Sequence, residues 1–110
     1  MKYILPLIAF AAPAFADAPV IENVAYSGGR FDVTLSHGDT GWDDYADGWR
    51  IELEDGTILG TRVLAHPHVN EQPFTRSSGI TVPEGVSEVF VRASTNVDGW
   101  AEATVPFSLP

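Results

Sequence analysis

The chain has 110 residues, no cysteine and a formal net charge of −9. This length fits one domain with a modest core, and a sequence without cysteine excludes disulfides, thiolate metal sites and thiol catalysis. The negative charge disfavours nucleic acids and anionic membranes as partners, because like charges repel at long range. Cations, metal ions and basic partners are instead attracted.

The N-terminus predicts export. Lys2 is followed by an apolar run over residues 3–12 and by Ala14-Phe15-Ala16, which has the A-x-A pattern of a signal-peptidase site. We therefore expect a signal peptide at residues 1–16, cleaved after Ala16, and a single mature domain at 17–110 in the periplasm or outside the cell. The apolar run is too short for a stable membrane span, so no membrane insertion is expected after cleavage.

The remainder alternates short apolar segments with turn residues and shows no amphipathic helical period. Apolar and polar residues alternate in 31–36 and 49–54, as in strands with one buried face. The dipeptides Gly28-Gly29 and Asp55-Gly56 predict tight turns. The expected strands cover residues 20–26, 31–36, 49–54, 57–65, 74–82, 86–94 and 101–109.

About seven strands at this spacing predict an all-β fold, an antiparallel two-sheet sandwich. The run VFVRASTNVDGW at 89–100 resembles the end of a fibronectin type III or related immunoglobulin-like domain, where alternating valines and an alanine precede an asparagine and a glycine. The resemblance implies an immunoglobulin-like sandwich, a fold that hosts many functions. Segments 37–49 and 66–76 also resemble segments of short exported bacterial proteins, a likeness that implies no chemistry.

The stretch HPHVNEQPFTR at 66–76 is a candidate metal site. In an extended segment, His66 and His68 project to the same side, about 7 Å apart along the chain. Glu71 could add an oxygen ligand, and His37, which follows the second expected strand, could reach the same end of the sandwich. Such a set suits copper or zinc. The alternative is a loop of hydrogen-bonded histidines in which Glu71 pairs with Arg76.

The same stretch has a second resemblance. Gly60, His66-Pro67-His68 and Glu71 are similar to the first metal motif of the cupins, which are jelly-roll barrels. Glu71 comes one residue earlier than in that motif, and Glu88 stands where the second motif has a histidine ligand. A small cupin-type metalloprotein therefore ranks below the immunoglobulin-like sandwich.

The segment HGDTGWDDYADGW at 37–49 combines aromatic and acidic residues. A loop of this composition can recognise a protein partner or stack on a glycan. Trp49 begins the alternating pattern of its strand and is expected in the core, whereas the other aromatics either cap that core or form a binding face. The candidate partner-binding residues are Trp42, Tyr45, Asp39, Asp43, Asp44 and Asp47.

No motif predicts catalysis. A nucleophile elbow, a phosphate-binding loop and a zinc-protease signature are all missing from the sequence. Ser36, His37 and Asp39 have the residue types of a catalytic triad, but neighbours on one extended segment point apart. We therefore expect a binding module rather than an enzyme, with an unknown protein, a glycan or a metal ion as its ligand.

Overall fold

The computed structural model describes residues 17–110, so the predicted signal peptide at 1–16 and its cleavage site lie outside the described residues. The described part contains eight β-strands and no α-helix. No helix in it has the length and apolar character needed to cross a bilayer. In chain order the strands are β1 (Val20–Ser27), β2 (Arg30–Ser36), β3 (Ala46–Glu52), β4 (Ile58–Val63), β5 (Phe74–Gly79), β6 (Glu88–Thr95), β7 (Gly99–Trp100) and β8 (Val105–Ser108).

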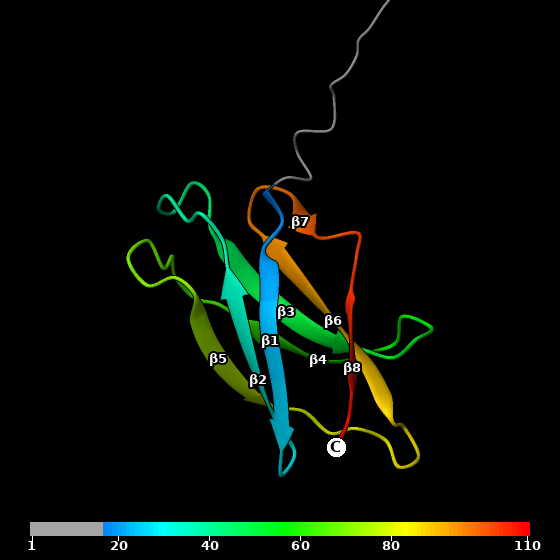
Figure 1. Ribbon diagram of the computed structural model, residues 1–110. Coiled ribbons are helices and arrows are strands. Elements are labelled where there is room, and N and C mark those ends of the chain that lie inside the picture. The colour runs from blue at the N-terminus through cyan, green and yellow to red at the C-terminus, as the bar shows by residue number, and fades with distance from the viewer. Residues whose placement is uncertain (1–16) are drawn as a thin grey trace, which may run out of the picture.

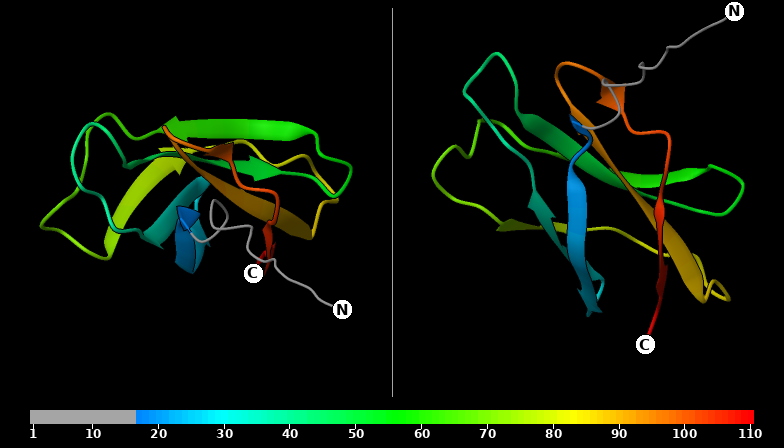
Figure 2. Two further views of the ribbon diagram at one scale, coloured as in Figure 1. Left: turned by 90° about the horizontal axis from the view of Figure 1, so that it is seen from above. Right: turned by 45° about the horizontal axis from the view of Figure 1, so that its top comes forward.

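The strands form two layers, which Figure 2 shows one above the other. One sheet has the order β1-β2-β5, and the other has the order β4-β3-β6, with β7 and β8 both pairing with β6. Every pairing between these strands is antiparallel. The predicted all-β, antiparallel two-sheet sandwich is thereby confirmed (Figure 1).

Glycines permit the two predicted turns. Gly28 and Gly29 have positive φ angles of 59° and 82° and join β1 to β2. Gly56, at φ 91°, lies in the turn between β3 and β4, which is closed by a bond from the Leu53 amide to the Thr57 carbonyl. Side chains would strain these left-handed conformations, which is why the sequence places glycine there.

The core lies between the sheets and is built from alternating residues, as the period-two pattern predicts. Trp49 is fully buried, which confirms its predicted place in the core. Its inward-facing neighbours along β3 and β6 are equally buried, and residues of β2 cover them from the other sheet. The buried apolar residues are Phe31, Val33, Leu35, Ala46, Trp49, Ile51, Leu64, Phe74, Ile80, Val89, Val91 and Ala93.

Several strand ends differ from the predicted ones. β3 begins three residues earlier than expected. β7 precedes the predicted final strand at 101–109, of which only residues 105–108 form a strand, β8. The interruption coincides with a side-chain contact, because Arg92 donates to the carbonyl oxygens of Ala101 and Glu102. Local sequence patterns do not reveal this contact, because the two carbonyls lie nine and ten residues from Arg92 along the chain.

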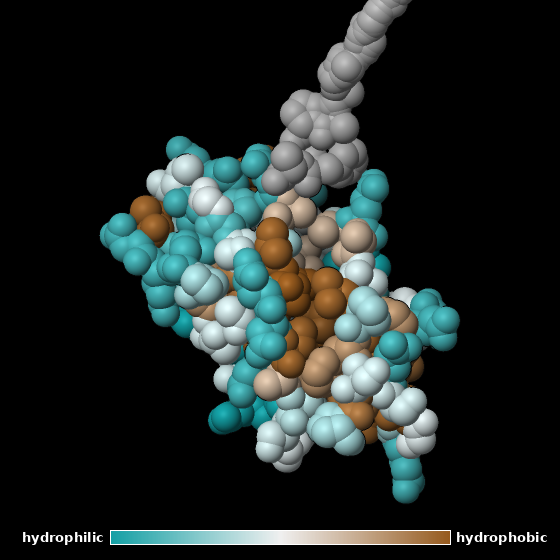
Figure 3. All heavy atoms as spheres, in the orientation of Figure 1, coloured by the Kyte–Doolittle hydropathy of each residue, from teal (hydrophilic) through white to brown (hydrophobic). Residues whose placement is uncertain are grey.

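The sandwich is less completely covered on the side where β1 and β8 form the edges of their sheets. Apolar atoms gather in the middle of this face in Figure 3. Val20 and Val105 are exposed there, while Val24 and Phe107 are half-buried against the core. Pro106 lies within β8, where a missing N–H discourages further strand pairing at this edge.

Close packing between the sheets predicts an effect at Gly60. A Cβ added at this residue of β4 would lie 2.8 Å from Cγ1 of buried Ile80. Gly60→Ala should therefore lower the free energy of unfolding by about 1–3 kcal/mol, as measured by urea denaturation. Gly79→Ala is the matched control, since a Cβ there meets only a carbonyl oxygen at 3.9 Å. Equal stability of the two variants would contradict this account of the packing.

Candidate functional site

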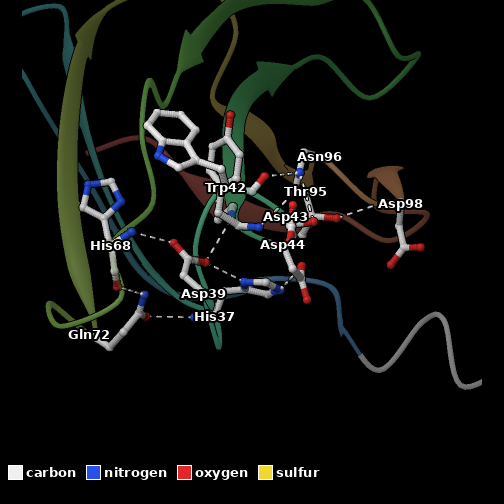
Figure 4. Close-up of polar contacts among 12 residues, drawn as sticks. His37, Asp39, Trp42, Asp43, Asp44, His68, Gln72, Thr95, Asn96 and Asp98 are labelled. Atoms are coloured by element: carbon white, nitrogen blue, oxygen red, sulfur yellow. Dashed lines mark hydrogen bonds and ion pairs between the residues drawn. The ribbon is translucent and has the colours of Figure 1, made fainter.

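The candidate residues meet at one end of the sandwich, where β2, β4 and β6 finish and β3 and β5 begin. We call this the loop end, and it consists of residues 37–45, 64–73 and 96–98. Figure 4 shows how side chains from all three segments approach one another there. The antiparallel order of the strands causes this convergence, since it brings segments far apart in the sequence to one edge.

Asp39 ties the first two segments together. Its Oδ1 accepts hydrogen bonds from the Ala46 amide at 3.0 Å and from Nδ1 of His37 at 2.6 Å, and its Oδ2 accepts one from the His68 amide at 2.8 Å. The residue is only 6% exposed. A buried carboxylate with three donors is well satisfied and holds the loops in one arrangement. The sequence pattern predicted that Asp39 binds a partner, but the residue is buried beneath the surface.

Gln72 forms a second link between the same segments. Its Nε2 donates to the His68 carbonyl at 2.9 Å, and its Oε1 accepts from the His37 amide at 2.9 Å. Sequence reasoning did not single out this residue. The only signal in the sequence was a glutamine between Glu71 and Pro73. Glutamine carries both a donor and an acceptor, so it can bridge two backbones.

His66 and His68 lie side by side. Their ring centroids are 4.6 Å apart, with 38° between the planes. His68 also stacks on Phe74 of β5, with centroids 3.9 Å apart and planes only 10° apart. His68 is 5% exposed, and neither of its ring nitrogens has a hydrogen-bond partner among the described residues. Burying an imidazole without a hydrogen bond costs free energy, so the burial of His68 needs an explanation.

The electrostatic setting keeps the His68 ring neutral. Burial lowers the pKa of His68 below its ordinary value, and the nearby charge of Arg76 acts in the same direction. Burial does so because the charged imidazolium loses its hydration there. The ring therefore carries a free lone pair at neutral pH, which is the form that binds a metal ion.

The other two predicted metal ligands are engaged elsewhere. Glu71 is paired with Arg76 at 3.1 Å, which helps to hold the pKa of that carboxyl below its usual range. His37 bonds to Asp39, and its Nε2 lies 3.8 Å from Oδ1 of Asp44. Within residues 17–110 no group of three or more metal-ligating side chains is arranged around one point. Only His66 and His68 of the four are brought together.

The aromatic residues of the loop end project from a braced turn. Trp42 is 65% exposed, whereas Tyr45 is half-buried, and the two rings meet edge to face with centroids 5.6 Å apart. Asn96 braces the turn, because its Nδ2 donates to the carbonyls of Trp42 and Asp43 and its Oδ1 accepts from the Tyr45 amide. No local signal in the sequence revealed this role of Asn96, whose partners lie more than 50 residues away.

The acidic candidates divide into two groups. Asp43 is exposed and Asp44 half-buried at the rim of the loop end, where Oδ1 of Asp44 is shielded from solvent without a hydrogen-bond partner. Asp47, by contrast, lies in β3 and accepts a hydrogen bond from the hydroxyl of Ser94. Asp39 and Asp47 therefore stabilise the scaffold, whereas Asp43 and Asp44 remain at the surface.

Comparisons with known proteins do not assign the chain to a family. No family model matches it. A protein of Halomicrobium mukohataei described as "Putative lipoprotein" is 48% identical over 88 residues, which are 76% of this chain and 43% of the relative. The chain thus spans less than half the length of that relative.

A solved structure shares the fold. Superoxide reductase (1Fe-SOR) from Giardia intestinalis superposes with a TM-score of 0.55 and 16% sequence identity, over 84% of this chain and 97% of that one. At this identity the likeness concerns the two-sheet architecture alone, because one β-sandwich can host unrelated functions.

Proposed function

We propose that the chain is a small exported binding module in which His66 and His68 bind one copper or zinc ion. The observation that carries the proposal is the pairing of the two rings, one of them buried with no hydrogen-bond partner for either nitrogen. A binding role without catalysis is part of the same proposal.

The ring spacing suits shared coordination. An ion that binds an imidazole nitrogen at about 2.0–2.1 Å lies about 3.1 Å from the ring centre, so two rings have centroids about 4.5 Å apart at the right angle of square-planar Cu(II) and about 5.1 Å apart at the tetrahedral angle of zinc. The observed separation of His66 and His68 is 4.6 Å. In the proposed site the exposed His66 ring turns so that its nitrogen and one nitrogen of His68 face the same ion.

Hydrogen bonding selects the nitrogen that His66 offers. Its Nδ1 lies 3.0 Å from the carbonyl oxygen of Pro67, which can only accept, so Nδ1 carries the hydrogen. The lone pair then resides on Nε2. Histidines that bind metal ions commonly donate their second ring N–H to a backbone carbonyl in this way. The contact thus supports His66 as an Nε2 ligand.

Two imidazoles leave coordination positions for other donors. Glu71 has a 58% exposed side chain, and its Oε1 is engaged by Arg76. His37 is held by Asp39 and does not join the pair. We therefore propose that water fills the remaining positions, as in open zinc sites, rather than a closed structural site with four protein ligands.

Two further proposals concern location and ancestry. The pattern at residues 1–16 supports export to the periplasm or the cell exterior, and the description of the Halomicrobium relative as a lipoprotein is in keeping with export. The facing strand orders, β1-β2-β5 and β4-β3-β6, support a fibronectin type III or immunoglobulin-like origin of the sandwich rather than a cupin barrel.

Calorimetric titration of the untagged mature chain with Cu(II) and Zn(II) tests the metal proposal. His66→Ala should weaken binding by about tenfold or more, since it removes one of two protein ligands. Glu71→Gln should change the affinity much less, because that side chain is engaged by Arg76. Electron paramagnetic resonance of the Cu(II) form should report two imidazole nitrogens in the wild type and one in His66→Ala.

The exposed position of His66 means that its replacement should leave the melting temperature unchanged, which separates a lost ligand from a lost fold. Equal affinities of wild type and His66→Ala would show that bound ions merely respond to the net negative charge, and the proposal would fail.

A further inference from the structure

The outer face of the larger sheet, which points away from β1, β2 and β5 (Figure 2), carries a charged cluster of its own. Oε2 of Glu52 accepts hydrogen bonds from Nε of Arg50 and from Nε of Arg92, each at 2.7 Å. Arg92 is almost fully engaged, since its Nη2 also bonds to Glu52 and its Nη1 bonds to two backbone carbonyls. One carboxylate thus serves two guanidinium groups, and the cluster keeps one positive charge.

Arg50 carries the unpaired part of this cluster. Within residues 17–110, its side chain forms one hydrogen bond, from Nε to Glu52, and its one ion pair is with the same residue. Its Nη1 and Nη2 have no partner in that range, and unlike Nε of Arg62 they are not shielded from solvent. The guanidinium therefore presents two free amino groups at the surface, although the side chain as a whole is only 19% exposed.

Trp100 holds this guanidinium in place. Cζ of Arg50 lies 4.2 Å from the centre of the indole ring, which itself lies close to Gly48, where an added Cβ would be 3.4 Å from Cη2 of the tryptophan. The stack on one side and the bond from Nε to Glu52 together fix the orientation of the planar group. Such a donor pair loses little entropy on binding, and its geometry matches the two oxygens of a carboxylate.

Exposed apolar side chains flank the cluster on the same face. The strand register pairs Val63 with Gly48, next to the indole, and residues paired across antiparallel strands point to the same side of a sheet. It likewise pairs Ile58 with Glu52. Val63 is 64% exposed and Ile58 is 50% exposed. A central arginine and tryptophan with apolar side chains around them have the composition of the anchor region of a protein–protein interface.

We propose that this face, independently of the histidine pair, binds an acidic segment of a partner protein. One aspartate or glutamate carboxylate of the partner takes both free amino groups of Arg50, and its apolar neighbours cover Val63 and Ile58. Charge decides this chemistry, because the cluster lacks one negative charge and a guanidinium offers donors only. A nucleic acid also carries anions, but the net charge of −9 repels an extended polyanion. For a short segment that repulsion is screened beyond about 8 Å at physiological salt.

The test uses the mature chain, residues 17–110, and a peptide acetylated and amidated at its ends, with one glutamate between two valines in a neutral background. NMR titration should show saturable shifts of the Trp100 indole N–H and of the Arg50 Nε–H. The same peptide with glutamine, which keeps the shape but lacks the charge, should bind at least about fivefold more weakly.

Two arginine variants separate a site from general attraction. Arg50→Gln and Arg30→Gln each remove one positive charge, and the side chain of Arg30, on the other sheet, is 64% exposed. Arg50→Gln should weaken peptide binding by about fivefold or more, whereas Arg30→Gln should change it by less than about twofold. Arg50→Lys keeps the charge but lacks the planar fork, so it should still weaken binding by about threefold or more.

An added carboxylate tests the same site without removing any member of the cluster. Thr61 is exposed and pairs with Arg50 across β3 and β4, where Cβ atoms of paired residues lie about 5 Å apart. Thr61→Glu therefore places an acid beside the free amino groups and should weaken peptide binding by about tenfold or more. Thr75→Glu adds the same charge at an exposed position of the other sheet and should change binding by less than about twofold.

Equal binding of the glutamine peptide, equal effects of Thr61→Glu and Thr75→Glu, or no saturable binding at all would overturn the proposal. Arg50-dependent binding of a peptide whose one carboxylate is its free C-terminus, in place of the glutamate peptide, would overturn it in favour of C-terminal recognition. A dimer detected by sedimentation and dissociated by Thr61→Glu would overturn it in favour of a second copy of the chain. None of these results bears on the metal site, because His66 and His68 are unchanged in every variant.

Discussion

Replacing Asp39 with alanine should lower the free energy of unfolding by about 3–5 kcal/mol, the largest effect that we expect at the loop end. The substitution would leave the amides of Ala46 and His68, together with Nδ1 of His37, without their acceptor in a buried setting. Each unpaired buried donor costs about 1–3 kcal/mol. Urea denaturation at neutral pH measures the loss.

Asp43→Ala is the control for this experiment, because Asp43 belongs to the same acidic segment but is exposed and its carboxylate accepts no hydrogen bond among the described residues. It should alter stability by less than about 0.5 kcal/mol. Asp39→Asn should fall between the two, since an amide retains one acceptor oxygen but turns an NH2 group toward a donor. If Asp39→Ala and Asp43→Ala were equally stable, the carboxylate of Asp39 would not be what joins the loops.

Glu52 should make the sandwich sensitive to acid. This glutamate is 2% exposed and accepts hydrogen bonds from Nε of Arg50 and Nε of Arg92, both at 2.7 Å. The hydrogen bond with Arg92, more than any other contact, lowers the pKa of Glu52, and Arg50 adds to the shift against the opposing effect of burial. Glu52 and its two arginine partners lie on the outer face of the larger sheet, where Arg50 also stacks on Trp100 at 4.2 Å.

The sign follows from the lowered pKa. In the unfolded chain Glu52 takes up a proton near the ordinary glutamate value of about 4.3, whereas in the folded chain it does so only at a lower pH. Its contribution to stability is therefore complete above that ordinary value and is lost as the pH falls through the folded pKa. Unfolding free energies measured from pH 7 down to pH 3 should show this decline.

Glu52→Gln should reduce this loss of unfolding free energy at low pH, because glutamine does not titrate. At neutral pH, Glu52→Ala should cost about 2–4 kcal/mol, since it leaves two partly buried guanidinium groups without their counter-charge. Glu54→Gln, at an exposed position two residues away, provides the comparison and should leave the pH profile intact. If Glu52→Gln lost as much unfolding free energy at low pH as the wild type, the acid sensitivity would belong to other carboxylates.

Short-range patterns were sufficient to predict most of the strands, the two turns and the inward-facing residues of the sandwich. Strand geometry has a period of two, so the alternation around Trp49 and Val91 reports burial directly. Glycine at a tight turn reports a positive φ angle in the same local way, as at Gly56. The adjacency of His66 and His68 was also predictable, because both belong to one short segment.

The partners of the polar residues were decided only by the tertiary structure. Asp39 shared its spacing and composition with the surface acids Asp43 and Asp44, yet folding buries it where three donors from two loops converge. His37 is directed to Asp39, and Glu71 to Arg76, so neither joins the histidine pair. A hydrogen bond needs a donor and an acceptor within about 3 Å. For segments separated by tens of residues, that distance is set by how the two sheets pack and not by any pattern along the chain.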